Sequence, residues 1–148
     1  MRGKKKTPKR KIKPDSKFNN TNVAKFINYI MKRGKKSIAQ AVFYDAMEIV
    51  AKETQKEPVE IFELAMKNIS PQLEIRTKRV GGANYQIPFP VRGDRRFALA
   101  SRWLLGAARE KKGKRMAEKL AEELIAASRN EGTAVRKRED VQKMAEAN

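Results

Sequence analysis

Apolar residues recur at helical spacing through most of the chain. They stand three or four positions apart in residues 21–34, 37–53, 57–70, 94–110 and 116–129. One apolar stripe in each segment is typical of amphipathic helices that pack around a shared core. A weaker sixth stripe, through Val141, Met144 and Ala145, follows a basic cluster near the C-terminal end. The pattern predicts a mainly α fold, with about six helices in a single domain over residues 20–148.

The predicted core is formed by the apolar side of each helix. Helix boundaries follow from capping residues: Asn20 or Thr21 can cap the first helix, Gly34 ends it, Ser37 caps the second helix and Asp94 caps the fourth. The residues expected to face the core are Val23, Phe26, Ile27, Ile30, Met31, Ile38, Val42, Phe43, Ala46, Met47, Ile49, Val50, Phe62, Ala65, Met66, Ile69, Phe97, Ala100, Leu104, Ala107, Ala108, Met116, Leu120, Ala121, Leu124 and Ile125.

Residues 73–91 break the helical pattern. Two runs with period-two alternation flank Gly81 and Gly82, which predicts a β-hairpin. Pro88 and Pro90 cannot donate to a ladder, so the second strand is expected to have a free edge or to leave its partner near its end. Because an isolated two-stranded ribbon is marginally stable in water, a basic ribbon in a helical protein is expected to be an arm that reaches a partner.

The tip of this hairpin allows two interpretations. Gly81 and Gly82 can let a backbone of RNA approach closely, with Tyr85 stacking on a base. Alternatively, the glycine pair only serves a turn that needs positive φ.

Composition narrows the function to the binding of a polyanion. The chain has 148 residues, with 35 Lys and Arg against 17 Asp and Glu, and a net charge of +18. It contains no Cys and no His, which excludes disulfides, zinc–thiolate sites, thiol nucleophiles and the usual general base. Absence of Cys fits a reducing compartment. No apolar run reaches the roughly twenty residues of a membrane span, and no apolar segment follows the basic N-terminus as in a signal peptide.

Residues 1–19 form a predicted basic tail. Pro8 and Pro14 interrupt it, and like charges repel one another, so the tail alone is expected to be disordered. It is interpreted as an RNA-binding arm, with a solubilising or targeting tail as the alternative. The basic residues of the tail are Arg2, Lys4, Lys5, Lys6, Lys9, Arg10, Lys11 and Lys13.

Basic residues also recur on five later elements. Arg95, Arg102 and Arg109 lie seven apart, so they drift only about twenty degrees per step along one helix face. Each feature has a structural alternative. The arginine row can be only a solvated basic face, and residues 34–37 can be only a helix connector instead of a phosphate-binding corner. Trp103 can lie at the edge of the core instead of stacking on a base. The further candidate RNA-binding residues are Lys35, Lys36, Arg76, Lys78, Arg79, Arg92, Arg96, Lys112, Lys114, Arg115, Arg136, Lys137 and Arg138.

Catalysis is not predicted. The basic corner at residues 34–37 lacks the preceding glycine of a phosphate loop and follows a helix, not a strand. Acids such as Asp45, Glu48 and Glu53 have helical spacing and form no recognisable catalytic pair. No cofactor or metal is expected.

The chain also resembles a known family, the bacterial-type ribosomal protein seven of the small subunit. Several long motifs occur in the family's order, so the resemblance covers nearly everything from Lys11 onward. They are residues 23–28 (VAKFIN), 34–37 (GKKS), 78–88 (KRVGGANYQIP), 98–104 (ALASRWL), 116–120 (MAEKL), 138–141 (REDV) and 144–148 (MAEAN).

The resemblance implies six helices with a β-ribbon between the third and fourth. It implies a primary binder of the 3′ major domain of small-subunit ribosomal RNA that nucleates assembly of the head, in a cytoplasmic or organellar ribosome. The family's ribbon lies by the exit-site transfer RNA and the messenger path, close to ribosomal protein eleven; proteins nine, thirteen and nineteen are other head neighbours. Some members also repress translation of their own messenger. The implied arm tip comprises Val80, Gly81, Gly82, Ala83, Asn84 and Tyr85.

The family's RNA contacts transfer onto matching residues here. They are the tail at residues 9–13, the corner at Lys35 and Lys36, the ribbon at residues 76–79, and the fourth-helix arginines Arg92, Arg95, Arg96 and Arg102.

The sequence departs from the family pattern in three places. Gln142 replaces the usual His, and residues 89–93 are variant at the base of the arm. Many members continue beyond the position of Asn148 with an aromatic and basic extension, so contacts of that extension are not carried over.

Two other functions are compatible with the pattern. An architectural DNA binder also combines a helical body with a basic β-arm and a nearby proline, commonly as a dimer. An RNA-modifying enzyme would need a cofactor fingerprint, which this sequence lacks.

Overall fold

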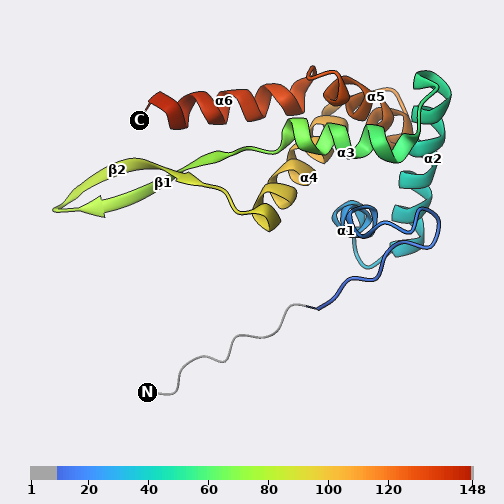
Figure 1. The fold of residues 1–148 in the computed structure, drawn as a ribbon, viewed down its shortest axis with the longest axis horizontal. Coiled ribbons are helices and arrows are strands. Elements are labelled where there is room, and N and C mark those ends of the chain that lie inside the picture. The colour runs from blue at the N-terminus through green and yellow to red at the C-terminus, as the bar shows by residue number, and fades with distance from the viewer. Residues whose placement is uncertain (1–9, 148) are drawn as a thin grey trace.

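The chain folds into six helices and one two-stranded antiparallel sheet (Figure 1). The computed structural model describes residues 10–147. Helices and hairpin occur in the predicted order, which confirms the mainly α fold with one projecting arm. The elements are α1 (Thr21–Ile30), α2 (Lys36–Thr54), α3 (Pro58–Ile69), β1 (Leu73–Val80), β2 (Ala83–Pro90), α4 (Gly93–Glu110), α5 (Met116–Ser128) and α6 (Thr133–Ala147).

The core is built on aromatic residues from α1, α2 and α3. Phe26, Phe43 and Phe62 are fully buried, with ring centroids 5.2–5.7 Å apart. Helix α5 packs against α2, α3, α4 and α6, and it fills the centre with Leu120 and Leu124. Most of the predicted apolar stripes are therefore confirmed as core.

The connection from α1 to α2 differs from the prediction. Helix α1 ends at Ile30, not near Gly34, because Met31 is already extended and Arg33 and Gly34 take positive φ of 54° and 73°. Helix α2 then begins at Lys36 with Lys35 as N-cap, so Ser37 lies inside the helix and is not its cap.

Three further predictions at helix faces and ends are wrong. Ile38 is 57% exposed, because α2 turns the larger side of Phe43, Met47 and Val50 inward. Asp94 lies in the first turn of α4, where Arg92 is the N-cap residue. Met144 is 55% exposed, while Ala145 beside it is buried.

Helix α6 is longer than its weak apolar pattern predicts. It begins at Thr133 and therefore includes the basic cluster at residues 136–138. Ala134 and Val135 anchor its start in the core, and its later part packs along both strands of the hairpin (Figure 1). Packing against the hairpin therefore stabilises α6, which has few apolar residues of its own for contact with the core.

The hairpin has the predicted two-residue turn. Gly81 and Gly82 take φ of +57° and +83°, as a type I′ turn requires, and Val80 pairs with Ala83 across it. Pro88 and Pro90 stay in register opposite Ile75 and Leu73, so β2 keeps a free edge and does not leave its partner. The outer half of the ribbon is exposed and extends beyond the helices (Figure 1).

The last residues of the predicted tail, from Asp15 onward, pack against the helical domain. The Asp15 carboxylate accepts hydrogen bonds from the backbone amides of Lys17, Phe18 and Asn20. Phe18 packs against the core, next to Tyr44. The boundary of the tail at residue 19 stays a prediction, while residues from Asp15 onward have a defined turn before α1 begins.

Candidate nucleic-acid interface

The described part of the tail meets the basic corner of residues 34–37 at Lys36. Arg10, Lys11, Lys13 and Lys36 line one hollow of about 520 Å³, and Asp15 is the only carboxylate among its described lining residues. That carboxylate is already occupied by backbone amides. Two of the predicted basic elements are thus brought together by the path of the chain into α1.

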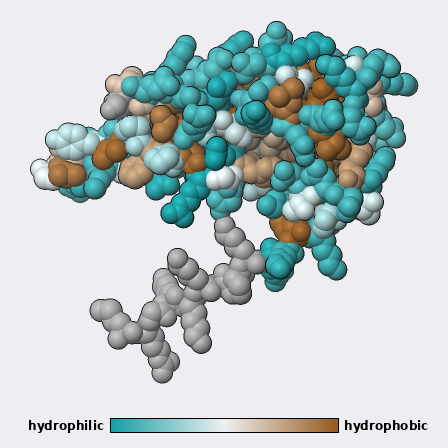
Figure 2. Space-filling view, in the orientation of Figure 1, coloured by the Kyte–Doolittle hydropathy of each residue, from teal (hydrophilic) through white to brown (hydrophobic). Residues whose placement is uncertain are grey.

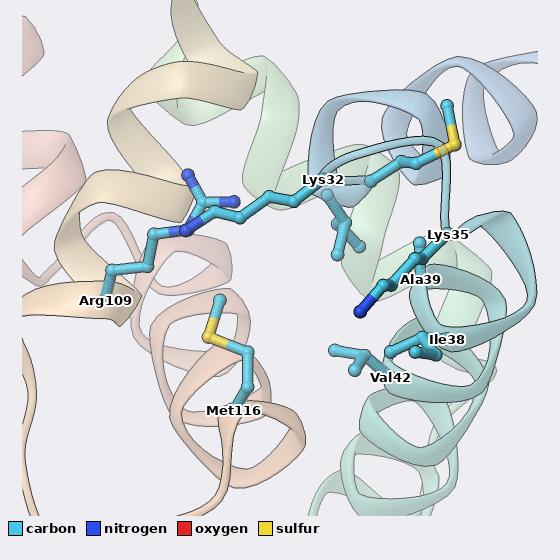
Figure 3. Close-up of a pocket in the computed structure, with 9 residues that line it drawn as sticks. Lys32, Lys35, Ile38, Ala39, Val42, Arg109 and Met116 are labelled. Carbon is cyan, nitrogen blue, oxygen red and sulfur yellow. The ribbon is translucent and has the colours of Figure 1, made fainter.

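The other side of the corner faces the end of α4. Lys32, Lys35 and Arg109 surround a hollow of about 260 Å³ whose lining is mostly apolar and includes Ile38 and Met116. Figure 3 shows Lys32 and Arg109 directed toward one another across this hollow. Two facing cations repel each other, so the site favours an anion between them. Lys32 was not among the predicted binding residues; its place directly after α1 is visible only once the helix end is known.

The arginine row of α4 connects the corner with the arm. Arg95, Arg102 and Arg109 are all exposed, on the side away from the buried Ala100 and Leu104. The row extends about 21 Å along the helix, at ~1.5 Å per residue. Arg109 lies at the corner and Arg95 at the base of the hairpin, so the row bridges the two.

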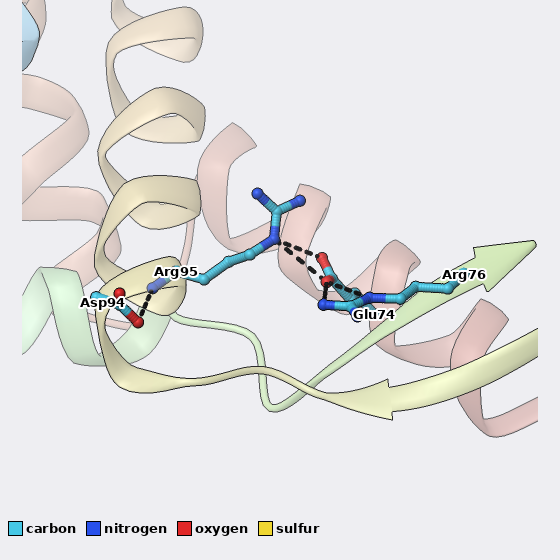
Figure 4. Close-up of polar contacts among 4 residues, drawn as sticks. All are labelled: Glu74, Arg76, Asp94 and Arg95. Carbon is cyan, nitrogen blue, oxygen red and sulfur yellow. Dashed lines mark hydrogen bonds and ion pairs between the residues drawn. The ribbon is translucent and has the colours of Figure 1, made fainter. Parts of the chain in front are cut away.

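A carboxylate that sequence analysis missed fixes the base of the arm. Glu74 pairs with Arg76 at 3.2 Å and with Arg95 at 3.1 Å, and its side chain is only 12% exposed (Figure 4). Arg76 also lies 5.0 Å from the ring centroid of Phe89. Glu74 therefore holds both guanidinium groups between β1 and α4. An acid within a basic strand is the sequence signal for such a contact.

The basic residues of the arm are divided between its two faces. Successive residues of a strand point to opposite sides, so Arg76 and Lys78 share one face and Arg79 lies on the other. Across the ribbon, Lys78 lies opposite the exposed Tyr85 in the strand register, and Arg79 lies opposite Asn84. The outer arm presents a cation on each side.

The loop between α4 and α5 is bound to carboxylates of α5. Lys111 contacts Glu122 at 3.1 Å and the buried Glu123 at 3.3 Å. Lys114 pairs with Glu122, and Arg115 with Glu118 at 3.3 Å. Of the three loop residues predicted to bind RNA, Lys114 and Arg115 are engaged in these pairs. Lys112 is exposed and makes no ion pair among residues 10–147.

These contacts shift two pKa values. The ammonium groups of Lys114 and Lys111 lower the pKa of Glu122. Burial opposes the charge on Lys111, but the carboxylates of Glu122 and Glu123 outweigh it and raise the pKa of that lysine. Both shifts favour the charged forms of Lys111 and Glu122. The main role of this loop is therefore to connect α4 to α5 through ion pairs, which we call the clamp.

The remaining predicted residues lie on α4 and α6 or outside the described range. Arg92 and Arg96 are exposed at the start of α4, and Arg136 and Lys137 on α6. Arg138 is half-buried and donates to Asn130 at 3.2 Å. Arg2, Lys4, Lys5, Lys6 and Lys9 fall outside residues 10–147.

Residues 10–147 contain no group of acidic residues placed to hold a metal ion. No helix in this range is long and apolar enough to cross a membrane. Hydrophilic side chains cover most of the face in Figure 2. The fold and this surface define a class: a basic helical protein with a projecting ribbon, built to contact a polyanion.

A comparison with known families shows to which family within this class the chain belongs. The chain belongs to the family described as Ribosomal protein S7p/S5e, whose sequence model matches residues 2–148. The family resemblance expected from the motifs is confirmed.

Individual relatives agree over nearly the whole length. The chain is 55% identical to the small ribosomal subunit protein uS7 of Moorella thermoacetica over 141 residues, which are 95% of this chain and 90% of that protein. It is 54% identical to the protein of the same name from Nitrosomonas eutropha over the same shares. For the one from Polynucleobacter necessarius, the match is 51% over 148 residues, covering 100% and 95%.

Family membership settles the coarse function. The chain is a structural constituent of the small ribosomal subunit and works in the ribosome; it is not an enzyme.

Proposed function

We propose that the chain is a primary binder of small-subunit ribosomal RNA and organises the 3′ major domain, the head of the subunit. It binds through a basic track, which we define as the tail, the corner at Lys35 and Lys36, the arginine row of α4, and the arm. The observation that carries the proposal is the position of α4. Its arginine row extends from the corner at Arg109 to the base of the arm at Arg95.

The charge along this track suits phosphate. Arg102 and Arg109 make no ion pair among residues 10–147, so their guanidinium groups are available. Glu74 orients Arg76 and Arg95 without burying them, since their side chains stay 56% and 47% exposed. The loop cations Lys114 and Arg115 contribute less, because carboxylates already hold them.

The arm carries a second part of the proposal. Its tip, residues Val80 to Tyr85, lies by the exit-site transfer RNA and the messenger path, next to ribosomal protein eleven. An exposed ribbon with a cation on each face and an exposed Tyr85 supports contact with nucleic acid on both sides. Ribosomal proteins nine, thirteen and nineteen are the other proposed neighbours. Repression of the chain's own messenger would use the same track.

The first experiment measures binding of the full chain over a salt series. The ligands are a head fragment of small-subunit ribosomal RNA, a duplex DNA of equal length and an unrelated folded RNA. We expect the head fragment to bind at least a hundredfold more tightly, about 2.7 kcal/mol, and to keep this preference as salt rises. Equal affinities that vanish together would show that only charge is recognised, as for an architectural DNA binder.

A pair of variants tests the track itself. Arg102→Gln is expected to weaken binding of the head fragment and to lower the salt slope by about 1. Lys56→Gln removes one charge from an exposed residue between α2 and α3 and is expected to change neither quantity.

The position of the arm is tested in assembled subunits. Because the chain has no Cys, Asn84→Cys provides a single attachment point for an iron chelate that cleaves nearby nucleic acid. We expect cleavage of exit-site transfer RNA or messenger. Cleavage confined to the body of the subunit would contradict this placement.

A further inference from the structure

Two hollows, each lined mainly by polar and charged residues, meet where the chain passes from α3 into β1. The first, about 530 Å³, is lined by Lys25 of α1, Lys67 of α3 and Arg96 of α4. The second, about 380 Å³, is lined by Lys67 again and by Arg138 of α6. Lys67, Ser70 and Gln72 line both hollows, so they separate two halves of one trough. Neither Lys25 nor Lys67 belongs to the basic track described above.

The trough has a surplus of positive charge. Lys25, Lys67 and Arg96 make no ion pair among residues 10–147. Asp94 is the one carboxylate among the lining residues of the first hollow, and it accepts a hydrogen bond from the backbone amide of Arg95. Within the described part of the chain, no carboxylate lines the second hollow. Both halves therefore favour an anionic occupant.

Arg138 provides a hydrogen-bond donor for an oxygen of that occupant. Its Nη2 donates to the Oδ1 of Asn130, but its Nε–H is buried and has no acceptor among residues 10–147. A buried N–H without a partner is costly. Arg138 lines the second hollow, so a bound oxygen that draws the guanidinium group toward the hollow would satisfy this donor. The planar guanidinium group suits the oxygens of a phosphate.

The other lining residues suit a sugar–phosphate chain more than a simple ion. Asn22, Gln72, Asn130 and Gln142 bring amide groups that can donate to phosphate oxygens and accept from ribose hydroxyls. Two cationic hollows on either side of one wall match a polymer with anionic groups at regular spacing.

We propose that this trough binds the backbone of one RNA strand as it crosses the connection between α3 and β1. One phosphate lies between Lys25 and Arg96, the next lies against Arg138, and Lys67 contacts both. The inference rests on the proposed function, since the strand belongs to the ribosomal RNA that the chain binds. It adds Lys25 and Lys67 to Arg96 and Arg138, which the sequence already predicted to bind RNA, and joins all four in one contact surface built by residues from four helices.

The test compares two lysines in matched positions. Lys67 and Lys52 each lie in the last turn of a helix, so both stabilise a helix C-terminus. We expect Lys67→Gln to weaken binding of the head fragment about three- to tenfold at moderate salt and to reduce the salt slope by about 1. Lys52→Gln is expected to leave both unchanged, and Lys67→Arg to restore them.

The thermal midpoints of the two Gln variants serve as the folding control, and we expect them to agree. If Lys67→Gln binds like Lys52→Gln while the wild-type chain keeps its preference for the head fragment, the trough proposal is overturned and the proposed function stands. If the wild-type chain shows no preference, both fall.

A placement experiment is independent of affinity. Gln72→Cys, in the wall shared by both hollows, carries an iron chelate in the full chain bound to the head fragment. We expect cleavage of one short stretch of RNA that is absent with Lys52→Cys. An uncut RNA with Gln72→Cys would overturn the proposal and would leave an acidic protein segment as the occupant to test.

Discussion

At the scale of single residues, Gly132 shows how the fold depends on a missing side chain. It lies between α5 and α6 with φ of +96°, a region that L-residues rarely adopt. A Cβ there would come within 3.1 Å of the Cβ of Ala126 and 3.2 Å of the Oε2 of Glu123. The conformation therefore favours glycine, and the space would hold a Cβ only if Ala126 or Glu123 moved slightly. Gly113, at φ of +84°, has the same conformational need but open space around it.

This contrast gives a matched prediction. Gly132→Ala should lower the free energy of unfolding by about 2–4 kcal/mol, from the left-handed conformation and from crowding. Gly113→Ala should cost only about 1–2 kcal/mol, because conformation alone contributes. Urea denaturation of both variants measures the difference. Equal losses would mean that Glu123 and Ala126 move aside without cost.

At the scale of elements, ion pairs join segments that are separate in the chain. Glu74 joins β1 to α4, and the pairs of Lys111 and Lys114 join the loop after α4 to α5. In each of these contacts, a carboxylate of one element pairs with a cation of another element. We expect these contacts to set the direction in which the arm leaves the body and the path of the chain between two core helices.

Loss of the Glu74 contact should loosen the arm. In Glu74→Gln the charge that holds Arg76 and Arg95 is gone, so amide hydrogen exchange in residues 73–80 should be faster than in the wild type. Global stability should fall by only about 1 kcal/mol, since both arginines are largely exposed. Glu118→Gln also removes an arginine partner, but on α5, and it should leave exchange in the hairpin unchanged. Unaltered hairpin exchange in Glu74→Gln would assign the arm's orientation to α6 instead.

The clamp at Glu122 should make stability depend on pH. Its pKa is lowered in the folded state by Lys114 and Lys111, so its contribution is present above the usual carboxyl pKa and is lost as pH falls through the folded value. Glu122→Gln should therefore be less stable than the wild type near neutral pH, by under about 1 kcal/mol for a partly exposed pair. The gap should close in acid, as measured by urea denaturation at several pH values. A gap independent of pH would exclude the charge as its cause.

At the scale of the whole molecule, the net charge of +18 opposes folding. Most cations lie on the surface, and the ion pairs described above neutralise only a few of them. The aromatic core and the central position of α5 must therefore hold together a body whose surface repels itself. The same concentration of positive charge favours the binding of RNA phosphates.

Salt should stabilise the isolated chain for this reason. Raising ionic strength from about 0.02 to 0.2 M shortens the Debye length several-fold, so repulsion between distant cations falls. We expect the thermal midpoint to rise over this range in differential scanning calorimetry, while an uncharged osmolyte of equal osmolality produces a smaller rise. A midpoint that falls with salt would mean that the ion pairs outweigh the repulsion.

Most of the fold was predictable from local pattern, and the misses have particular causes. Helix α2 has apolar residues around much of its circumference, so periodicity alone did not exclude Ile38 from the core. Helix α6 has few apolar residues, and its length depends on packing against the hairpin. Glu123 is an acidic residue yet only 2% exposed, and its partner Lys111 comes from another element.

Sequence by itself determined the helices, the hairpin with its glycine turn, the basic character of the surface and the family, because each rests on residues near one another in the chain. Only tertiary structure decided which cations remain available. Lys114 and Arg115 are held by carboxylates, whereas Arg102 and Lys67 make no ion pair within residues 10–147. It also decided which cations meet, as at the corner and in the trough. The physical reason is that an ion pair or a shared hollow joins residues far apart in the chain, and their distance is set by how the helices pack.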